Sequence, residues 1–318
     1  MDPRQEPRQI LADLDLEQCK VQFSKKPIVL LCGGHVPEKA HADAPDPEIR
    51  SLRDAITRKA LAAYPSPHLF RPEEIKSWHE DGVFKNLMDF ETDLSSICSL
   101  VAIAVESAGS IAELGAFSQL PDLSKKLIVF VPEEYSEVSS FINLGILRYI
   151  KESHRSGVKV YPWSPNHPRD IPEHLAGDAL EDISAELNDL PKSQSFDLSN
   201  NVHLMVLIYE LIRLYVAIKE SEILDALKFF GRELQREDIR RKLFLLQQFS
   251  LVQKITYSDS MFYACGNETF HNLRVVLKSG ASFDPLRRHV ECVEYYKNNN
   301  SERNRNRAIE RAKLGEPK

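Results

Sequence analysis

The sequence lacks the features that mark a secreted, membrane-spanning or metal-binding protein. Its five cysteines are odd in number and scattered, with no C-x-x-C pair, which argues against a disulfide framework and a zinc ribbon. No run of about 18 apolar residues exists, so no transmembrane helix is expected, and the polar residues 1–10 lack the pattern of a secretory signal. The ten histidines form no H-x-x-x-H or H-E-x-x-H motif, so no metal site is expected. We therefore expect a soluble protein of the reducing cytoplasm.

Charge is distributed unevenly along the chain. Lys and Arg number 41 and Asp and Glu 47, a net charge of −6. Residues 1–190 carry 20 basic and 31 acidic side chains, whereas residues 191–318 carry 21 basic and 16 acidic ones. An acidic N-terminal part joined to a basic C-terminal part predicts two functions. The basic part is either a nucleic-acid-binding surface or simply a solvated surface.

The front of the chain alternates short apolar runs with helical patterns. Such alternation is typical of an α/β domain with a mainly parallel sheet. Ligands bind such sheets beyond the carboxyl ends of the strands, which directs attention to Gly33-Gly34 and to the loop Glu106–Glu113. The expected strands are 27–32, 68–70, 97–105, 126–131 and 158–161, and the expected helices are 48–64, 84–96, 111–120, 141–151 and 172–190.

The rear of the chain has a different pattern, after a polar stretch over 191–201 that we interpret as a linker. Helical patterns over 203–218, 222–230 and 236–249 precede a β-hairpin pattern over 251–265. This order predicts a mostly helical winged helix-turn-helix domain over 202–290, followed by a basic tail over 291–318. The tail is either flexible or a helix that becomes ordered when it binds a partner.

The third helix of this domain would be the recognition element. Its cations and one near the wing are expected to contact DNA phosphates, although winged helices also serve as protein docking modules. The predicted DNA-binding residues are Arg236, Arg240, Arg241, Lys242 and Lys254.

The most informative segment is E-S-A-G-S-I-A-E-L-G-A-F over 106–117. Gly109 permits a tight turn after the strand, and Ser110 would cap a helix whose first turn contains Glu113. A carboxylate at this edge can attack the anomeric carbon of a sugar or activate water for that attack. Glu106 would orient the sugar hydroxyls or supply a second carboxylate. Alternatively, Glu113 only completes a capping box with Ser110.

Several motifs resemble, in order, those of the effector proteins of retrons, which are bacterial anti-phage systems. Residues 106–117 also resemble the catalytic loop of nucleoside 2-deoxyribosyltransferase-like proteins, and more distantly that of phosphoribohydrolases that activate cytokinins. The resemblance covers about residues 27–150. Its motifs are Cys32-Gly33-Gly34, Pro72-Glu73, Glu106–Ser118, Lys126–Val131 and Ser140-Phe141-Ile142-Asn143.

The resemblance implies an N-glycosidase domain of nucleoside deoxyribosyltransferase-like fold over 1–190, fused to a DNA-binding domain. Such a protein would be a toxin that hydrolyses a nucleotide, with NAD favoured as substrate and no cofactor. It would be held inactive by a reverse transcriptase and its multicopy single-stranded DNA/RNA hybrid until phage infection. It would form homo-oligomers and associate with no membrane.

The resemblance also assigns roles to residues. Glu113 would be the catalytic carboxylate, and Glu106, Ser107, Gly109 and Ser110 would line the ribose and phosphate. Other candidates are less clear. Gly33 and Gly34 would approach the nucleotide through their backbone, Asn143 would donate to a base or hydroxyl or instead satisfy backbone groups, and Glu73 and Glu91 would contact substrate or be capping or solvated carboxylates.

Two alternative functions remain open from the sequence. Deoxyribosyltransferases carry an Asp shortly before the sugar loop, whereas this chain has Glu106 at a spacing one residue longer, which argues against deoxyribosyl transfer. The other alternative is a nucleotide-sensing DNA-binding regulator without catalytic turnover.

Overall fold

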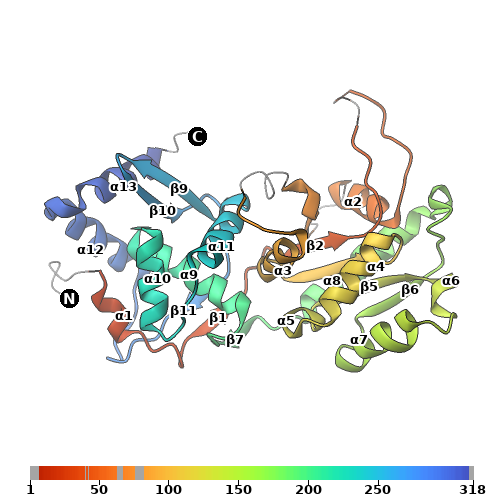
Figure 1. Ribbon diagram of the computed structural model, residues 1–318, viewed down its shortest axis with the longest axis horizontal. Coiled ribbons are helices and arrows are strands. Elements are labelled where there is room, and N and C mark those ends of the chain that lie inside the picture. The colour runs from red at the N-terminus through yellow and green to blue at the C-terminus, as the bar shows by residue number, and fades with distance from the viewer. Residues whose placement is uncertain (1–6, 40, 42, 63–66, 76–81, 315–318) are drawn as a thin grey trace. The chain divides into compact units, whose positions relative to one another are not determined.

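The protein consists of two compact units, each built from separate stretches of the chain (Figure 1). The computed structural model describes residues 7–39, 41, 43–62, 67–75 and 82–314. The sheet unit comprises Lys25–Lys76 and Leu94–Leu190. The helical unit comprises Met1–Ser24, Ser77–Asp93 and Pro191–Lys318. Residues 1–24 and 77–93 thus belong with the C-terminal part of the chain, although they precede the expected boundary at residue 190.

The sheet unit contains a five-stranded parallel sheet with the order β3-β2-β4-β5-β6. The predicted α/β class and all five predicted strands are confirmed. Parallel strands covered on both faces must be apolar along their whole length, which explains why they stand out in the sequence. The strands are β2 (Ile28–Cys32), β3 (His68–Phe70), β4 (Leu100–Ala104), β5 (Leu127–Pro132) and β6 (Val158–Tyr161).

The strand order reverses between β2 and β4. From β2 the chain moves outward to β3 on one side and then returns to β4 on the other side. Loops after neighbouring strands diverge at such a switch point, and the crevice left beyond the carboxyl ends binds ligands in open α/β sheets. The segments that follow β2 and β4 at this switch point begin at Gly33 and at Val105.

Helices cover both faces of the sheet. The helices α2 (Leu52–Ala62) and α8 (Glu173–Asp189) pack together over one face, where Leu31 and Phe130 belong to their core. The helix α4 (Ala108–Ser118) packs against β4 and against the π-helix η3 (Ile142–Leu147). The remaining helices of this unit are η1 (Pro72–Glu74), α5 (Pro121–Ser124), α6 (Glu133–Ser136), α7 (Arg148–Ser153) and η4 (Pro168–Asp170).

In the helical unit, three helices precede a β-hairpin, as the sequence predicts. They are α9 (Asn201–Tyr215), α10 (Glu220–Phe229) and α11 (Arg236–Gln248). The hairpin strands β9 (Val252–Tyr257) and β10 (Ser260–Cys265) pair with each other, and β8 (Ala217–Ile218) pairs with β10. A helical second domain is thereby confirmed, while its winged-helix assignment stays a prediction.

A second small sheet was not anticipated. Its order is β11-β1-β7, with β1 (Lys20–Gln22) paired antiparallel to both β7 (Ser193–Ser195) and β11 (Asn272–Arg274). The strand β7 lies inside the stretch 191–201 that was expected to be a linker. Strands of three residues with mostly exposed polar side chains carry no hydrophobic periodicity, so the sequence gives no sign of them.

The basic C-terminal segment is folded rather than a tail. It forms most of α12 (Pro285–Asn298), the short η5 (Asn300–Glu302) and α13 (Arg303–Leu314). The helix α13 packs on β9 and β10, with Ala308 and Ile309 buried. One further short helix, α1 (Gln9–Asp13), lies in this unit. Among the described residues, no helix combines the length and apolarity needed to cross a bilayer.

Candidate active site

Glu113 lies in the second turn of α4, beside the switch point. The helix begins at Ser107, whose side chain accepts the N–H of Ser110, so the pair Ser107 and Ser110 forms the capping box. Glu113 is six residues past this cap, beyond the first turn where the sequence analysis placed it. The alternative in which Glu113 completes a capping box with Ser110 is therefore wrong, and the position of its carboxylate needs another explanation.

The Glu113 carboxylate is largely buried and incompletely satisfied. Its Oε2 is shielded from solvent and has no hydrogen-bond partner among the described residues. Burial raises the pKa of this carboxyl group; Arg53 and a hydrogen bond from the Cys32 thiol lower it, and the charge of Glu73 raises it further. A buried carboxylate oxygen left without a donor is costly to the fold, and such costs are commonly kept where a reaction uses the group.

Cys32 connects Glu113 to the sheet. It is the last residue of β2 and is buried. Side chains alternate between the faces of a strand, and Leu31 points into the core under α2 and α8, so Cys32 points to the opposite face. The Cys32 thiol, on strand β2, thereby forms a hydrogen bond with the carboxylate of Glu113, which is on helix α4.

Glu106 makes backbone contacts that the sequence does not predict. Its Oε1 accepts the N–H groups of Gly34 at 2.9 Å and Arg53 at 3.0 Å, and its Oε2 accepts the N–H of Leu52 at 2.7 Å. Burial raises the pKa of this carboxyl group, although the three backbone donors lower it. The carboxylate ties the first turn of α2 to the loop after β2, so its oxygens already have partners.

Gly33 and Gly34 permit close packing beside Glu106. A Cβ atom on Gly33 would lie 2.8 Å from the Cβ of Arg53, and one on Gly34 would lie 2.7 Å from the Cβ of Ser51. The N–H of Gly34 donates to Glu106, and its carbonyl accepts from Arg53. Glycine is required here by the approach of α2, which is a different reason from the predicted contact with a nucleotide.

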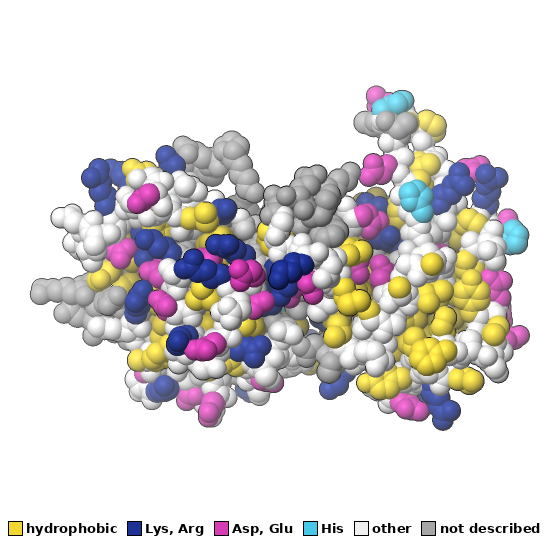
Figure 2. All heavy atoms as spheres, in the orientation of Figure 1, with side chains coloured by type: hydrophobic (Ala, Val, Ile, Leu, Met, Phe, Trp, Pro, Cys, Tyr) yellow, Lys and Arg dark blue, Asp and Glu magenta, His cyan; other side chains and the backbone are white. Residues whose placement is uncertain are grey.

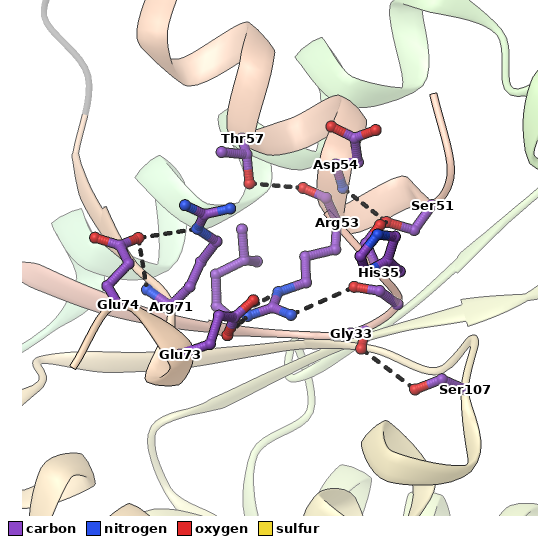
Figure 3. A network of polar contacts seen from close by, with 12 residues as sticks. Gly33, His35, Ser51, Arg53, Asp54, Thr57, Arg71, Glu73, Glu74 and Ser107 are labelled. Atoms are coloured by element: carbon purple, nitrogen blue, oxygen red, sulfur yellow. Dashed lines mark hydrogen bonds and ion pairs between the residues drawn. The ribbon is translucent and has the colours of Figure 1, made fainter. Parts of the chain in front are cut away.

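Arg53 is the functional candidate that the sequence analysis missed (Figure 3). Its side chain is buried, and its Nε donates to the Leu31 carbonyl at 2.9 Å. One terminal nitrogen forms an ion pair with Glu73 at 2.6 Å, and the guanidinium also acts on the charge of Glu113. Burial raises the pKa of Glu73, but this ion pair outweighs it and leaves that pKa lowered. The sequence did contain a sign that Arg53 is unusual, because a basic residue in the first turn of a helix opposes the helix dipole.

The remaining predicted residues of this loop cap the helix. The Ser107 hydroxyl donates to the Gly33 carbonyl at 3.2 Å, and the buried Ser110 hydroxyl accepts the N–H groups of Glu106 and Ser107. Gly109 is exposed at the second position of the helix, where a Cβ would meet nothing closer than 3.8 Å. It is not needed for a tight turn, and it leaves the outward-facing N–H groups of this first turn open to an approaching anion.

Two other predicted residues lie on other helices. The Asn143 side-chain amide donates to the carbonyls of Tyr135 and Val138, so it joins η3 to α6 and to the turn that follows α6. Glu91 is buried in α3 (Leu87–Ile97), in the part of that helix that belongs to the helical unit. The structure therefore groups Glu113, Cys32 and Arg53, together with the half-exposed Glu73.

The same edge of the sheet has a hollow beyond β5 and β6. Its volume is about 370 Å³. Its lining is acidic and consists of Glu133, Glu134, Pro162, Trp163, Ser164, His167 and Asp170. Among the described residues, no three His, Cys, Asp or Glu side chains are grouped as a metal site requires. Carboxylates of this kind can accept hydrogen bonds from sugar hydroxyls or amino groups.

Most of the predicted DNA-binding cations are paired with carboxylates of their own unit. Lys242 is buried and lies 3.3 Å from Asp93, which also contacts Arg241 at 3.1 Å. Arg240 forms an ion pair of 3.1 Å with Glu220. The other two predicted residues, Arg236 and Lys254, are exposed. Blue and magenta side chains accordingly alternate over α10 and α11 in Figure 2.

Comparisons with known proteins agree with this architecture. Residues 49–254, well over half of the chain, match the model of a family described as STM3845 retron effector protein. An Escherichia coli protein named "Retron Ec73 putative ribosyltransferase/DNA-binding protein" is 30% identical over 148 residues, which are 45% of this chain and 44% of the relative. Its Escherichia coli counterpart, "Retron Ec86 putative ribosyltransferase/DNA-binding protein", is 28% identical over 131 residues, 41% of this chain and 39% of the relative.

The aligned region thus spans less than half the length of either curated relative. The family match covers both β4 with the Glu113 helix in the sheet unit and the helices α9 to α11 in the helical unit. The resemblance that the motifs indicate is confirmed at the level of the family. The chain belongs to the STM3845 retron effector protein family.

Proposed function

We propose that the sheet unit cleaves the N-glycosidic bond of a nucleotide, with the nicotinamide–ribose bond of NAD as the favoured target. The observation that carries this proposal is the Glu113 carboxylate, buried beside the switch point with one oxygen lacking a hydrogen-bond partner among the described residues. The word ribosyltransferase in the names of the two relatives supports chemistry at a ribose carbon.

The reaction needs one carboxylate at the anomeric carbon. As the C1′–N bond breaks, positive charge develops on the ribose, and the ionised Glu113 stabilises it or bonds to C1′. The bonding electrons leave with the base. Water then adds to C1′ and loses a proton to solvent or to the carboxylate. The remainder of the nucleotide is released with a hydroxyl group at C1′ of its ribose. Burial strengthens the electrostatic part of this effect because few waters screen the charge.

The disposition of the other carboxylates favours NAD over a neutral nucleoside. Glu106 is engaged by three backbone N–H groups, and Glu73 is paired with Arg53. A neutral purine needs a proton from an acid in order to leave, whereas the nicotinamide of NAD is cationic and leaves as a neutral molecule without one. A site with a single uncommitted carboxylate suits the second kind of leaving group.

We further propose that this activity serves anti-phage defence and is held inactive by a reverse transcriptase with its multicopy single-stranded DNA. Family membership and the term DNA-binding in the relatives' names support this assignment. In this arrangement the helical unit contacts nucleic acid, and the sheet unit is the toxin.

Incubation of the purified protein with NAD, nucleosides and nucleoside monophosphates, followed by chromatography, tests the proposal. We expect release of nicotinamide and a loss on the order of 10³-fold in Glu113→Gln, because that change removes the stabilising charge. Glu137→Gln, at an exposed glutamate outside the site, is the matched control. Equal rates for wild type and Glu113→Gln would remove Glu113 from the mechanism.

Two further outcomes distinguish the alternatives. Cleavage that requires an added acceptor base would indicate transfer of the sugar instead of hydrolysis. If the wild-type protein binds a nucleotide but releases no base from any of these compounds, the protein is a sensor and the enzymatic proposal is wrong.

A further inference from the structure

The helix α13 carries more exposed positive charge than the predicted recognition helix α11, in which Arg236 and Arg240 are the exposed cations. It contains five cations and one carboxylate, in the sequence RNRNRAIERAKL. Arg305 points inward, where it is buried and paired with Glu222 at 2.6 Å and Glu302 at 2.7 Å. The other four cations are exposed: Arg303, Arg307, Arg311 and Lys313.

Three of these cations form a stripe. Arg303, Arg307 and Arg311 follow one another at intervals of four residues, so each step rises about 6 Å and turns about 40° around the helix. The stripe is about 12 Å long; Ala308 and Ile309 are buried on another side of the helix, and Arg311 at one end of the stripe contacts the hairpin strand β9. Lys and Arg side chains are visible over the outer surface of α13 in Figure 2.

Few carboxylates neutralise this surface. Glu310 pairs with Arg307 at 2.7 Å, and both side chains are about half exposed. Asp259 at the hairpin turn lies 3.5 Å from the Asn304 amide. In contrast, Arg240, Arg241 and Lys242 of α11 each have a carboxylate partner. Exposed ion pairs contribute little to stability, so the charge of α13 is not explained by helix formation.

The position of Arg303 also indicates that the charge of α13 does not serve helix stability. It begins α13, where a positive charge opposes the helix dipole and therefore costs stability. A cation retained at an unfavourable position, in line with two others on an open face, is expected where an anionic partner binds.

We propose that the stripe Arg303, Arg307 and Arg311 contacts the phosphate backbone of duplex DNA, and that α13 rather than α11 supplies the main electrostatic contact. Single-strand binding requires aromatic rings on which bases stack. The aromatic ring beside the stripe is Tyr257, and the Arg311 guanidinium already covers it at 5.0 Å from the ring centre. Arg311 is held there by the Thr256 carbonyl at 3.0 Å. A row of cations whose neighbouring ring, Tyr257, is already covered suits a phosphate backbone better than unstacked bases.

This inference rests on the proposed nucleic-acid role of the helical unit. The experiment measures binding of the full chain to a mixed-sequence DNA duplex by fluorescence anisotropy across a range of salt concentrations. The variant Arg303→Gln/Arg307→Gln/Arg311→Gln removes three cations. Each phosphate contact contributes about 0.9 to the slope of log K against log salt, so we expect the slope to become shallower by about 2.7.

Matched variants control for charge, position and folding. Replacing the same three arginines by lysine keeps the charge and should retain the slope. The variant Arg236→Gln/Arg240→Gln/Lys254→Gln removes three cations from α11 and β9 and should leave the slope nearly unchanged. Arg311 has tertiary contacts, so the double variant Arg303→Gln/Arg307→Gln, with an expected decrease of about 1.8, serves if the triple variant unfolds.

Each outcome decides between specific readings. A slope that falls in the α11 variant and not in the α13 variant overturns the inference and restores α11 as the contact surface. Tighter binding of the matching single strand, with the same sensitivity to the α13 variants, overturns the choice of duplex. Absence of DNA binding by the wild-type chain refutes the nucleic-acid role itself and favours a protein partner.

Discussion

Glu106 and Glu113 follow the same strand and are both partly buried, yet their surroundings differ. Glu106 receives three backbone N–H groups, whereas Glu113 has one oxygen without a partner among the described residues. Burial raises the pKa of both carboxyl groups. The difference in donors separates a carboxylate that holds two segments together from one that remains available for chemistry.

The helical unit repeats this contrast with cations. The helix α11 has Arg240, Arg241 and Lys242 in ion pairs, whereas among the described residues the α13 row of arginines has one such pair, Arg307 with Glu310. In both units, a count of charged residues finds the charges but does not tell which are already neutralised. Uncompensated charge is the better guide to where a ligand binds.

The largest effect on stability is expected from Glu106→Gln. The glutamine amide can present only one acceptor oxygen to three donors, so its NH₂ group would face the N–H of Leu52 and leave it unpaired. We expect a loss of about 1–3 kcal/mol in unfolding free energy. Thermal unfolding monitored by circular dichroism measures this loss, and an unchanged midpoint would contradict the structural role of Glu106.

Glu113→Gln is expected to have the opposite sign. Because the folded-state pKa of Glu113 is raised, its stabilising contribution is complete only below the unfolded-state pKa and is lost as the pH rises through the folded value. Removal of the charge should therefore raise the thermal midpoint at pH 7 and have little effect near pH 4. If Glu113→Gln is as destabilising as Glu106→Gln, the contrast between the two carboxylates is lost.

A smaller effect is expected from Cys32→Ala. The Cys32 thiol lowers the pKa of Glu113 by hydrogen bonding, so its loss should raise that pKa. The acidic limb of the pH–rate profile for base release should then move to higher pH. Cys32→Ser keeps a donor and serves as the control; an identical profile for the alanine variant would mean that this hydrogen bond has no influence on the reaction.

The smallest effect is expected from Glu73→Gln. The Glu73 charge raises the pKa of Glu113, and its removal also leaves Arg53 free to act on Glu113 alone. Both changes should move the acidic limb to lower pH with little effect on the maximal rate. A large fall in that rate, with the limb in place, would instead give Glu73 a direct role with the substrate.

The sheet could be predicted because its three central strands, β2, β4 and β5, are continuous apolar runs. The run Pro27–Cys32 ends at two glycines, and β2 ends at Cys32. Three-residue polar strands such as Ser193–Ser195 have no comparable signal, since their pairing partners lie far away in the sequence.

At the candidate site, sequence reasoning singled out Glu113 and Glu73 but missed Arg53, whose charge acts on both. The start of α4 was placed at Ser110 because S-x-x-E matches a capping box, but S-A-G-S from Ser107 competes for the same role and wins. Arg53 lies 60 residues from Glu113 in sequence, so only the parallel pairing of β2 and β4 brings the two together. Spacing along the chain carries no information about such a long-range contact.

The sheet β11-β1-β7 has a consequence for attempts to divide this protein. Its central strand comes from Lys20–Gln22, and its partners come from beyond residue 190. A cut of the chain near residue 190 would separate β1 from both of its neighbouring strands. Each fragment would then have exposed strand edges, which are prone to aggregate. Fragments made by a cut between the two parts are therefore poor substitutes for the intact polypeptide in studies of either part.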